Sequence, residues 1–199
     1  VCSNTSWDKA RFEVCGHKWV DLSEQNYGVS LLNDCKYGFS TKNNNLMLTV
    51  LKCGTYPNEV ADQGLHEFSY SIYPHKGNFA SGGTAKAAYS FNQPLRTAEV
   101  SGRAGKAPTE YGFVKCGNEN VIIETLKQCE DNDDYILRLY DTFNCRTEAV
   151  IEFALAIDNI ELCDLMEHPI EKLDFEGNSV KIKINNYEIL TLKVSFKNK

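Results

Sequence analysis

A chain of 199 residues is long enough to bury a substantial core, either as one all-β domain or as two smaller ones. Its hydrophobic content of 42% and formal net charge of -6 are typical of a folded acidic protein and exclude an intrinsically disordered one. Lysine and arginine are scattered, and no apolar run approaches the roughly 18 residues of a membrane-spanning helix, so we predict contact with neither nucleic acid nor membrane.

The first strand-like segments lie before residue 75. Runs of strand length, rich in β-branched and aromatic residues, cover 27–34, 45–53 and 66–74. The Gly and Asn residues between the first two runs, at 35–45, are typical of a turn. An Ala-rich stretch predicts a helix over 84–91 that ends at Asn92-Gln93-Pro94.

The segment 97–112 has small residues, glycines, a proline and no periodicity, which is typical of a linker. Six short strands are predicted after it, separated by tight polar connections, at 120–129, 134–143, 148–155, 159–166, 179–184 and 187–196. This pattern indicates a small antiparallel sandwich. Within it, Ile136 and Arg138 alternate with Leu137 and Leu139, so at least one face of that strand should be solvated.

The cysteines carry information about redox environment. The eight stand at positions 2, 15, 35, 53, 116, 129, 145 and 163 without a C-x-x-C pair, which makes a zinc ribbon or redox motif improbable. An even number leaves a disulfide framework open. Because several lie in apolar runs, buried free thiols in a reducing compartment are favoured, and we expect a cytoplasmic protein. The chain starts at Val1 with neither an initiator Met nor a signal sequence, which indicates a piece of a longer polypeptide.

The stretch "ADQGLHEFSYSIYPHKG", residues 61–77, is the strongest candidate for chemistry. It begins like the H-E-x-x-H zinc motif at His66, but the second ligand position is Tyr70 and the stretch alternates as a strand rather than a helix. Asp62 and Glu67 could be the two carboxylates of a glycosidase, although sequence does not define their separation. The residues alone therefore leave both hypotheses weak.

Two further groups stay open on the residues alone. The four histidines, at 17, 66, 75 and 168, could meet in space at a metal ion, but their spacing follows no ligand pattern. Trp7 and Trp19 could stack on a sugar, although a place in the core is favoured in a chain this rich in aromatic residues. Composition and spacing thus indicate a mostly β protein in two parts without naming its function.

Three long blocks, "NTSWDKARFEVCGHKWVDLSEQNYGVSLLNDCKYG", "LMLTVLKCGTYPNEVADQGLHEFSYSIYPHKG" and "AAYSFNQPL", resemble the C-terminal region of glycoside hydrolase family 38 α-mannosidases, in the cytosolic, vacuolar and microbial branch. The resemblance continues through "VIIETLKQCEDNDDYILRLYD" and "IELCDLMEH", so it covers almost the whole chain.

The resemblance implies an enzyme that hydrolyses terminal α-linked mannose with retention, through a covalent intermediate on an Asp. It also implies a zinc ion held by two His and two Asp. Nucleophile and zinc ligands belong to an N-terminal barrel domain that would lie upstream of Val1. None of the residues of this sequence matches those positions, so we expect no catalytic residue, no metal ligand and no cofactor in this chain. Its expected partners are that barrel and α-mannoside glycans.

The resemblance also divides the chain. Residues 1–96 resemble the closing part of the family's mutarotase-like β-supersandwich, 97–112 are the linker, and 113–199 resemble its terminal β-sandwich. The supersandwich lends polar side chains to the rim of the active site, and the matching positions predict four substrate-binding residues: Lys52, Asp62, Gln63 and His66. Lys52 stands where relatives usually have Arg, so it keeps the charge without the bidentate fork.

Two alternatives from other classes remain at this point. One is a free-standing carbohydrate-binding module with an exposed row of aromatic residues. The other is an oligomerisation domain that holds copies of the protein together.

Overall fold

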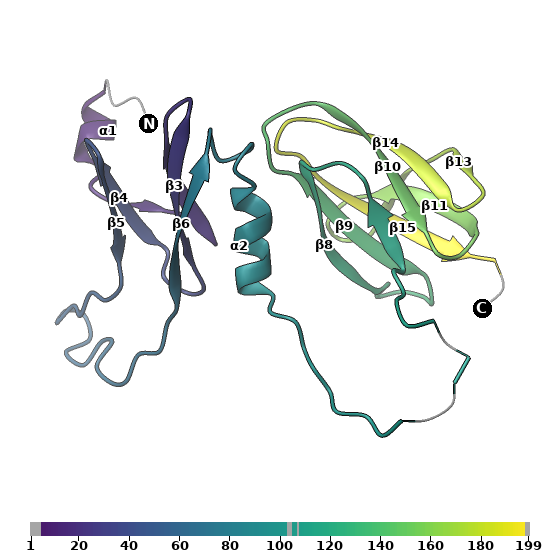
Figure 1. Ribbon diagram of the computed structural model, residues 1–199, viewed down its shortest axis with the longest axis horizontal. Helices are drawn as coiled ribbons and strands as arrows, with labels where there is room; N and C mark the ends of the chain where they lie inside the picture. The colour runs from purple at the N-terminus through teal and green to yellow at the C-terminus, as the bar shows by residue number, and fades with distance from the viewer. Residues whose placement is uncertain (1–4, 103–104, 107, 198–199) are drawn as a thin grey trace. The chain divides into compact units, whose positions relative to one another are not determined.

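The computed structural model describes residues 5–102, 105–106 and 108–197 (Figure 1). The chain divides between Ala98 and Glu99 into two compact units, called here the first and the second unit. In the described part, no helix is long and apolar enough to cross a membrane.

The first unit combines two small antiparallel sheets with helices. Its elements are α1 (Ser6–Ala10), β1 (Val14–Cys15), β2 (Trp19–Ser23), β3 (Tyr27–Asn33), β4 (Gly38–Lys42), β5 (Asn45–Thr49), β6 (Tyr70–Lys76) and α2 (Thr84–Asn92). The sheets have strand orders β1-β4-β5 and β2-β3-β6. Helix α2 packs on β2 and β3 (Figure 1) through a face that includes the buried Ala85 and Ala88.

Two expected elements of this unit are confirmed by β3 and α2. The strand predicted at 45–53 ends at Thr49, and the one predicted at 66–74 begins at Tyr70. The turn predicted over 35–45 is wrong because its middle forms β4, which pairs with β5. Only Asn43 and Asn44 make the turn: Asn43 has a φ of 56°, the left-handed conformation that a two-residue hairpin turn requires and Asn tolerates.

The second unit is a two-sheet antiparallel sandwich, which confirms the mainly β fold class. Its strands are β7 (Val114–Cys116), β8 (Val121–Gln128), β9 (Tyr135–Asp141), β10 (Thr147–Phe153), β11 (Ile157–Cys163), β12 (Pro169–Lys172), β13 (Phe175–Glu176), β14 (Ser179–Ile184) and β15 (Ile189–Phe196). The strand orders are β13-β14-β10-β7 and β12-β11-β15-β9-β8. The inner faces meet in one apolar core that holds Leu137, Ile151, Ile182 and Leu192.

The expectation of a solvated face on β9 holds only in part, because Arg138 and Tyr140 on the outer face are partly exposed whereas Ile136 is not. Leu137 and Leu139 point into the core, yet Ile136 on the other face is also fully buried. The connection between β11 and β12 lies over this outer face, where the Arg138 guanidinium donates to the Leu165 carbonyl at 3.0 Å. A connecting segment that folds back in this way is invisible to strand alternation, which reports only that neighbouring side chains point in opposite directions.

The cysteines differ from expectation in burial. All seven described cysteines are free, but only Cys129 and Cys163 are buried. Cys15, Cys35 and Cys53 are exposed, so the prediction that the thiols are buried is wrong for them. These three lie in short elements and loops of the first unit, where little of the chain packs over them.

Candidate functional site

Lys52, Asp62, Gln63 and His66 all lie on one long connection between β5 and β6, residues 50–69 (Figure 1), called here the 50–69 loop. Lys52 is exposed and makes no hydrogen bond or ion pair with any other residue that the structure describes. Its ammonium is therefore free to bind a ligand, but nothing in the loop orients it.

Asp62 organises the second half of this loop through its backbone. Its backbone is left-handed, with a φ of 56°, and its carbonyl accepts from two donors, the His66 Nε2–H at 2.8 Å and the Cys53 thiol at 3.6 Å. The Gln63 amide donates to the Glu59 carbonyl at 3.2 Å. The structure thus brings Asp62, Gln63 and His66 together, while the Asp62 carboxylate itself has no partner among the described residues.

The end of the loop is anchored to the turn after β3. The Ser69 N–H donates to the Asp34 carboxylate at 2.9 Å, and the Cys35 thiol faces the Glu67 carbonyl at 3.9 Å. The neighbouring Cys35 thiol lowers the pKa of Asp34, and the Asp34 carboxylate raises the pKa of Cys35. This anchor holds the end of the loop where β6 begins.

The four histidines do not meet. His66 is tied to the Asp62 carbonyl, His75 to the Asp21 carboxylate and His168 to the Asp164 carboxylate, while His17 lies 3.6 Å from the Cys15 sulfur. Within the part of the chain that the structure describes, no group of three or more His, Cys, Asp or Glu is placed to hold a metal ion.

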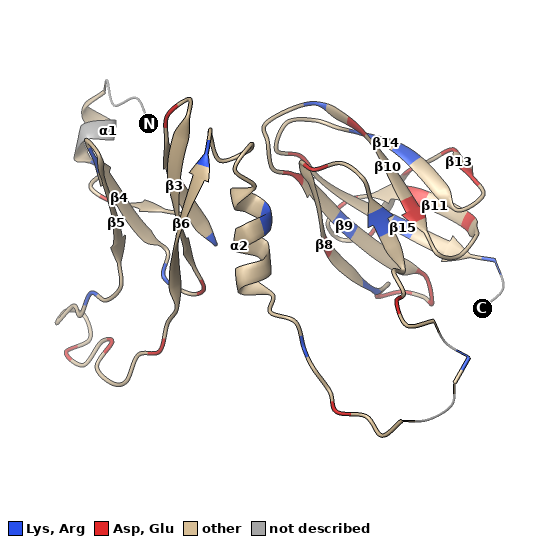
Figure 2. Cartoon of the chain, in the orientation of Figure 1, with Lys and Arg blue, Asp and Glu red and all other residues tan. Residues whose placement is uncertain are grey.

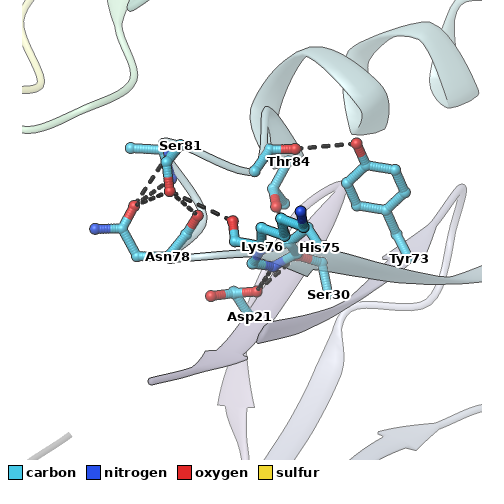
Figure 3. Close-up of polar contacts among 10 residues, drawn as sticks. Asp21, Ser30, Tyr73, His75, Lys76, Asn78, Ser81 and Thr84 are labelled. Carbon is cyan, nitrogen blue, oxygen red and sulfur yellow. Dashed lines mark hydrogen bonds and ion pairs between the residues drawn. The ribbon is translucent and has the colours of Figure 1, made fainter. Parts of the chain in front are cut away.

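A buried polar network joins the sheet β2-β3-β6 to α2 (Figure 3). The Asp21 carboxylate accepts from the Ser30 hydroxyl at 2.7 Å and from the His75 Nε2–H at 2.8 Å. Ser30 has donated its one proton, so the Thr84 hydroxyl, 2.7 Å away, must donate to the Ser30 oxygen. The side chains of His75 and Asp21 are only 3% and 7% exposed.

This network contains Ser, His and Asp but is not arranged for nucleophilic catalysis. The Ser30 hydroxyl and the His75 imidazole both bond to Asp21, so the imidazole does not accept the Ser30 proton. A Cβ at Gly28 or Gly82 would overlap the imidazole, so two glycines close around the ring. The network holds three strands and a helix together, and it is a structural element.

Sequence reasoning missed Asp21, Ser30 and Thr84. A signal for them is present in the sequence. Asp21 and Ser30 alternate with apolar neighbours in their strands, namely Val20, Leu22, Val29 and Leu31. Ser30 and His75 therefore point to the same face of the sheet, which α2 covers. Polar residues that share a face with a helix indicate a buried network.

The two tryptophans differ in exposure, and the charged residues of the described part form no block of one sign (Figure 2). Trp19 stacks on Phe79 with ring centroids 5.3 Å apart and belongs to the packing of the first unit, whereas Trp7 is 84% exposed. Figure 2 shows charges of both signs interspersed in each unit. On the sheet β13-β14-β10-β7, for example, Glu148 lies opposite Lys183 and Glu152 opposite Lys115.

Comparisons with known proteins match both units. Residues 2–60 match the family profile described as "Glycosyl hydrolases family 38 C-terminal domain". Residues 120–192 match "Glycosyl hydrolases family 38 C-terminal beta sandwich domain". The second profile falls entirely on the sandwich of the second unit.

The chain is also similar to longer proteins. It is 38% identical over 194 residues to human alpha-mannosidase 2C1, covering 95% of this chain and 18% of that protein. It is 38% identical to alpha-mannosidase G of Dictyostelium discoideum, over 96% of this chain and 18% of that one. The chain therefore spans about a fifth of the length of these relatives.

A solved structure shows the same fold. The crystal structure of an alpha-mannosidase from Enterococcus faecalis superimposes with a TM-score of 0.77 over 96% of this chain and 22% of that chain, at 16% sequence identity. Fold and matches together define the C-terminal β region of a glycosyl hydrolase family. The chain belongs to glycosyl hydrolase family 38 and is similar to one part of the longer α-mannosidases named above.

Proposed function

We propose that this chain is the C-terminal, non-catalytic β region of an α-mannosidase that hydrolyses terminal α-linked mannose with retention. The observation that carries the proposal is 38% identity along 95% of the chain to a protein of which it spans only 18%. In this proposal a barrel outside residues 1–199 carries the nucleophile, the first unit is the end of the supersandwich, and 97–112 link it to the sandwich.

The 50–69 loop is the part of this chain that borders the sugar site in this proposal. Lys52 and the Asp62 carboxylate are free of partners among the described residues. The Gln63 side chain is bonded to the Glu59 carbonyl, and His66 to the Asp62 carbonyl. An ammonium and a carboxylate without internal partners can exchange water for sugar hydroxyls at little cost. The loop is anchored at its end by Asp34, which limits its freedom where β6 begins.

The residues that the structure describes include no group placed to hold zinc. The histidines lie apart, and two of them bond to carboxylates that they would have to leave. The described residues therefore do not fit a two-His, two-Asp site, and the ion implied by the family resemblance would be held by the barrel. We derive no step through it.

Location and assembly belong to the same proposal. A cytoplasmic location is supported by the resemblance to the cytosolic branch and by the free state of the seven described cysteines. Fractionation of cells that produce the protein tests it, and recovery from the secretory pathway contradicts it. A homo-oligomer of the longer polypeptide is tested by its mass in solution.

The decisive experiment assays an aryl α-mannoside with the longer polypeptide that contains this chain and with residues 1–199 alone, before and after treatment with a zinc chelator. We expect zinc-dependent turnover by the longer polypeptide only. Turnover by residues 1–199 alone, or none by the longer polypeptide, overturns the proposal.

The sugar-rim role of the loop has a separate test in the longer polypeptide. Replacing Lys52 by Ala should raise KM for the mannoside about threefold to tenfold, the effect of losing one hydrogen bond of about 1 kcal/mol. Lys42→Ala, on an exposed residue at the end of β4, is the matched control and should leave KM unchanged. Equal KM values for the two variants contradict the role of Lys52.

A further inference from the structure

The connection between β11 and β12, residues 164–168 and called here the 164–168 loop, is held by several internal hydrogen bonds. The Asp164 carboxylate accepts from the N–H groups of Met166 at 2.8 Å and His168 at 2.9 Å. The Glu167 N–H donates to the Asp164 carbonyl at 3.1 Å. These bonds define the backbone of the loop locally.

Glu167 then fastens the loop to the outer face of the sheet. Its side chain is 4% exposed and lies 2.8 Å from the Lys127 ammonium and 3.6 Å from the Arg138 guanidinium. It also accepts from the Glu130 N–H at 3.0 Å. A φ of 69° at Glu167 is a strained conformation for a residue other than Gly, and these contacts maintain it.

This rigid loop presents large apolar side chains to solvent. Leu165 is 61% exposed and Met166 is 74% exposed, although they flank the buried Glu167. The Arg138 bond to the Leu165 carbonyl places the loop beside β9, and Arg138 pairs with Thr191 in the register of β15. Two residues before Thr191, on the same face, Ile189 is 59% exposed. Leu165 and Met166 of the loop, together with Ile189 on the same outer face of the sheet, are called here the Leu165 patch.

We propose that the Leu165 patch is the surface through which the second unit docks on the part of the same polypeptide that lies outside residues 1–199. This inference rests on the proposed function. Large apolar side chains on a pre-organised loop are typical of a docking site, because little conformational entropy is lost when the partner binds.

The length of the relatives argues for this occupant. The patch lies inside the segment 120–192, which matches a domain described as the C-terminal β sandwich of longer hydrolases. The relatives are about five times longer than the stretch that matches them. A neighbouring domain of the same chain is present at high effective concentration, so three apolar side chains can suffice for docking.

Met166 itself supplies the probe. The chain has two methionines, Met47 and Met166, one in each unit, so peroxide oxidation followed by peptide mass analysis reads each unit separately. In the native longer polypeptide, we expect Met166 to oxidise at least about tenfold more slowly than in the same polypeptide unfolded in urea. Equal oxidation rates overturn the proposal.

A second measurement identifies the segment that covers the Leu165 patch. A photo-crosslinking phenylalanine analogue in place of Leu165 should crosslink to residues outside 1–199 of the same molecule. Crosslinks to residues 1–98 would show that the first unit covers the Leu165 patch. Crosslinks between two molecules would show that a second copy covers it. Either result overturns the proposal. The same analogue at the exposed Tyr56 of the 50–69 loop controls for non-specific crosslinking by light and by the analogue. Its crosslinks should be to residues other than those that Leu165 captures.

Failure of the docking proposal can be told apart from failure of the proposed function. A polypeptide that hydrolyses the mannoside but leaves Met166 accessible defeats the docking surface alone. Protection and intramolecular crosslinks in a polypeptide without mannoside turnover support docking and defeat the proposed function.

Discussion

Replacing Glu167 by Gln keeps the size of the side chain and its backbone preference but removes its charge. The Lys127 ammonium is the main cause that lowers the pKa of Glu167, with help from the Glu130 N–H and against the opposing effect of burial. The pKa of Glu167 is lowered from an ordinary 4.5 to about 2. The carboxylate form is therefore strongly preferred in the folded protein.

The magnitude follows from this shift. A pKa held near 2 rather than 4.5 corresponds to about 3 kcal/mol of preference for the charged form. Lys127 and Arg138 are 29% and 30% exposed, so solvent screening reduces the effect on stability to about 1–2 kcal/mol. For a cooperative unit of this size, we expect Glu167→Gln to lower Tm by about 5–10 °C at pH 7.

The pH dependence gives the sharper test. Because the folded pKa is lowered, the stabilisation is complete above pH 4.5 and is lost as pH falls toward 2. The difference in free energy of unfolding between parent and variant, measured in urea, should therefore shrink by roughly half or more between pH 6 and pH 3. The control is Glu171→Gln, because Glu171 is an exposed residue of β12. This variant should change the free energy of unfolding by less than about 0.5 kcal/mol. A Glu167→Gln variant as stable as its parent at pH 7 refutes the role assigned to this carboxylate.

Three further predictions concern other parts of the chain. Gly82→Ala should destabilise the first unit by about 1–3 kcal/mol in urea unfolding, because the added Cβ overlaps the His75 imidazole. Asp141→Ala should destabilise the second unit by about 3 kcal/mol, since this buried carboxylate accepts from a side-chain amide at 2.7 Å and a backbone N–H at 3.0 Å. In the native protein a thiol reagent should modify the exposed Cys53 quickly, and Cys163, whose pKa is raised by burial, only on unfolding.

Each of these has a matched control or a contradicting result. Gly117→Ala adds a Cβ in open space and should be nearly neutral, so an equal loss for both glycine variants contradicts the overlap at His75. Asp158→Ala removes an exposed carboxylate and should also be nearly neutral, so a similar loss at both aspartates disproves the special role of Asp141. Modification of Cys163 as fast as Cys53 shows that the sheet β12-β11-β15-β9-β8 opens in the native state.

Local patterns predicted the elements that are regular over several residues. β3 was found because its apolar residues have strand length and a polar boundary, and α2 because Ala-rich sequence ends at Pro94. β4 was missed because its sequence is short and polar and lies beside a run of Asn. Its strand conformation is stabilised by pairing with β5, and pairing is a property of two segments rather than one.

The candidate site was only partly predictable. The 50–69 loop could be singled out for its polar residues, but the bonds that converge on the Asp62 carbonyl depend on a left-handed backbone that propensity does not report. The network of Asp21, Ser30 and His75 joins residues 54 positions apart, and only the sheet register brings them together.

The sequence by itself determined the class of this protein: its composition requires a folded acidic chain, its alternation requires strands, and its long ordered blocks place it in family 38. The tertiary structure decided which polar groups are buried and which apolar groups are not. Glu167 is 4% exposed and Leu165 is 61% exposed, against the ordinary preference of both residue types. The physical reason is that burial depends on what a distant segment lays over each side chain, as the 164–168 loop does over β9.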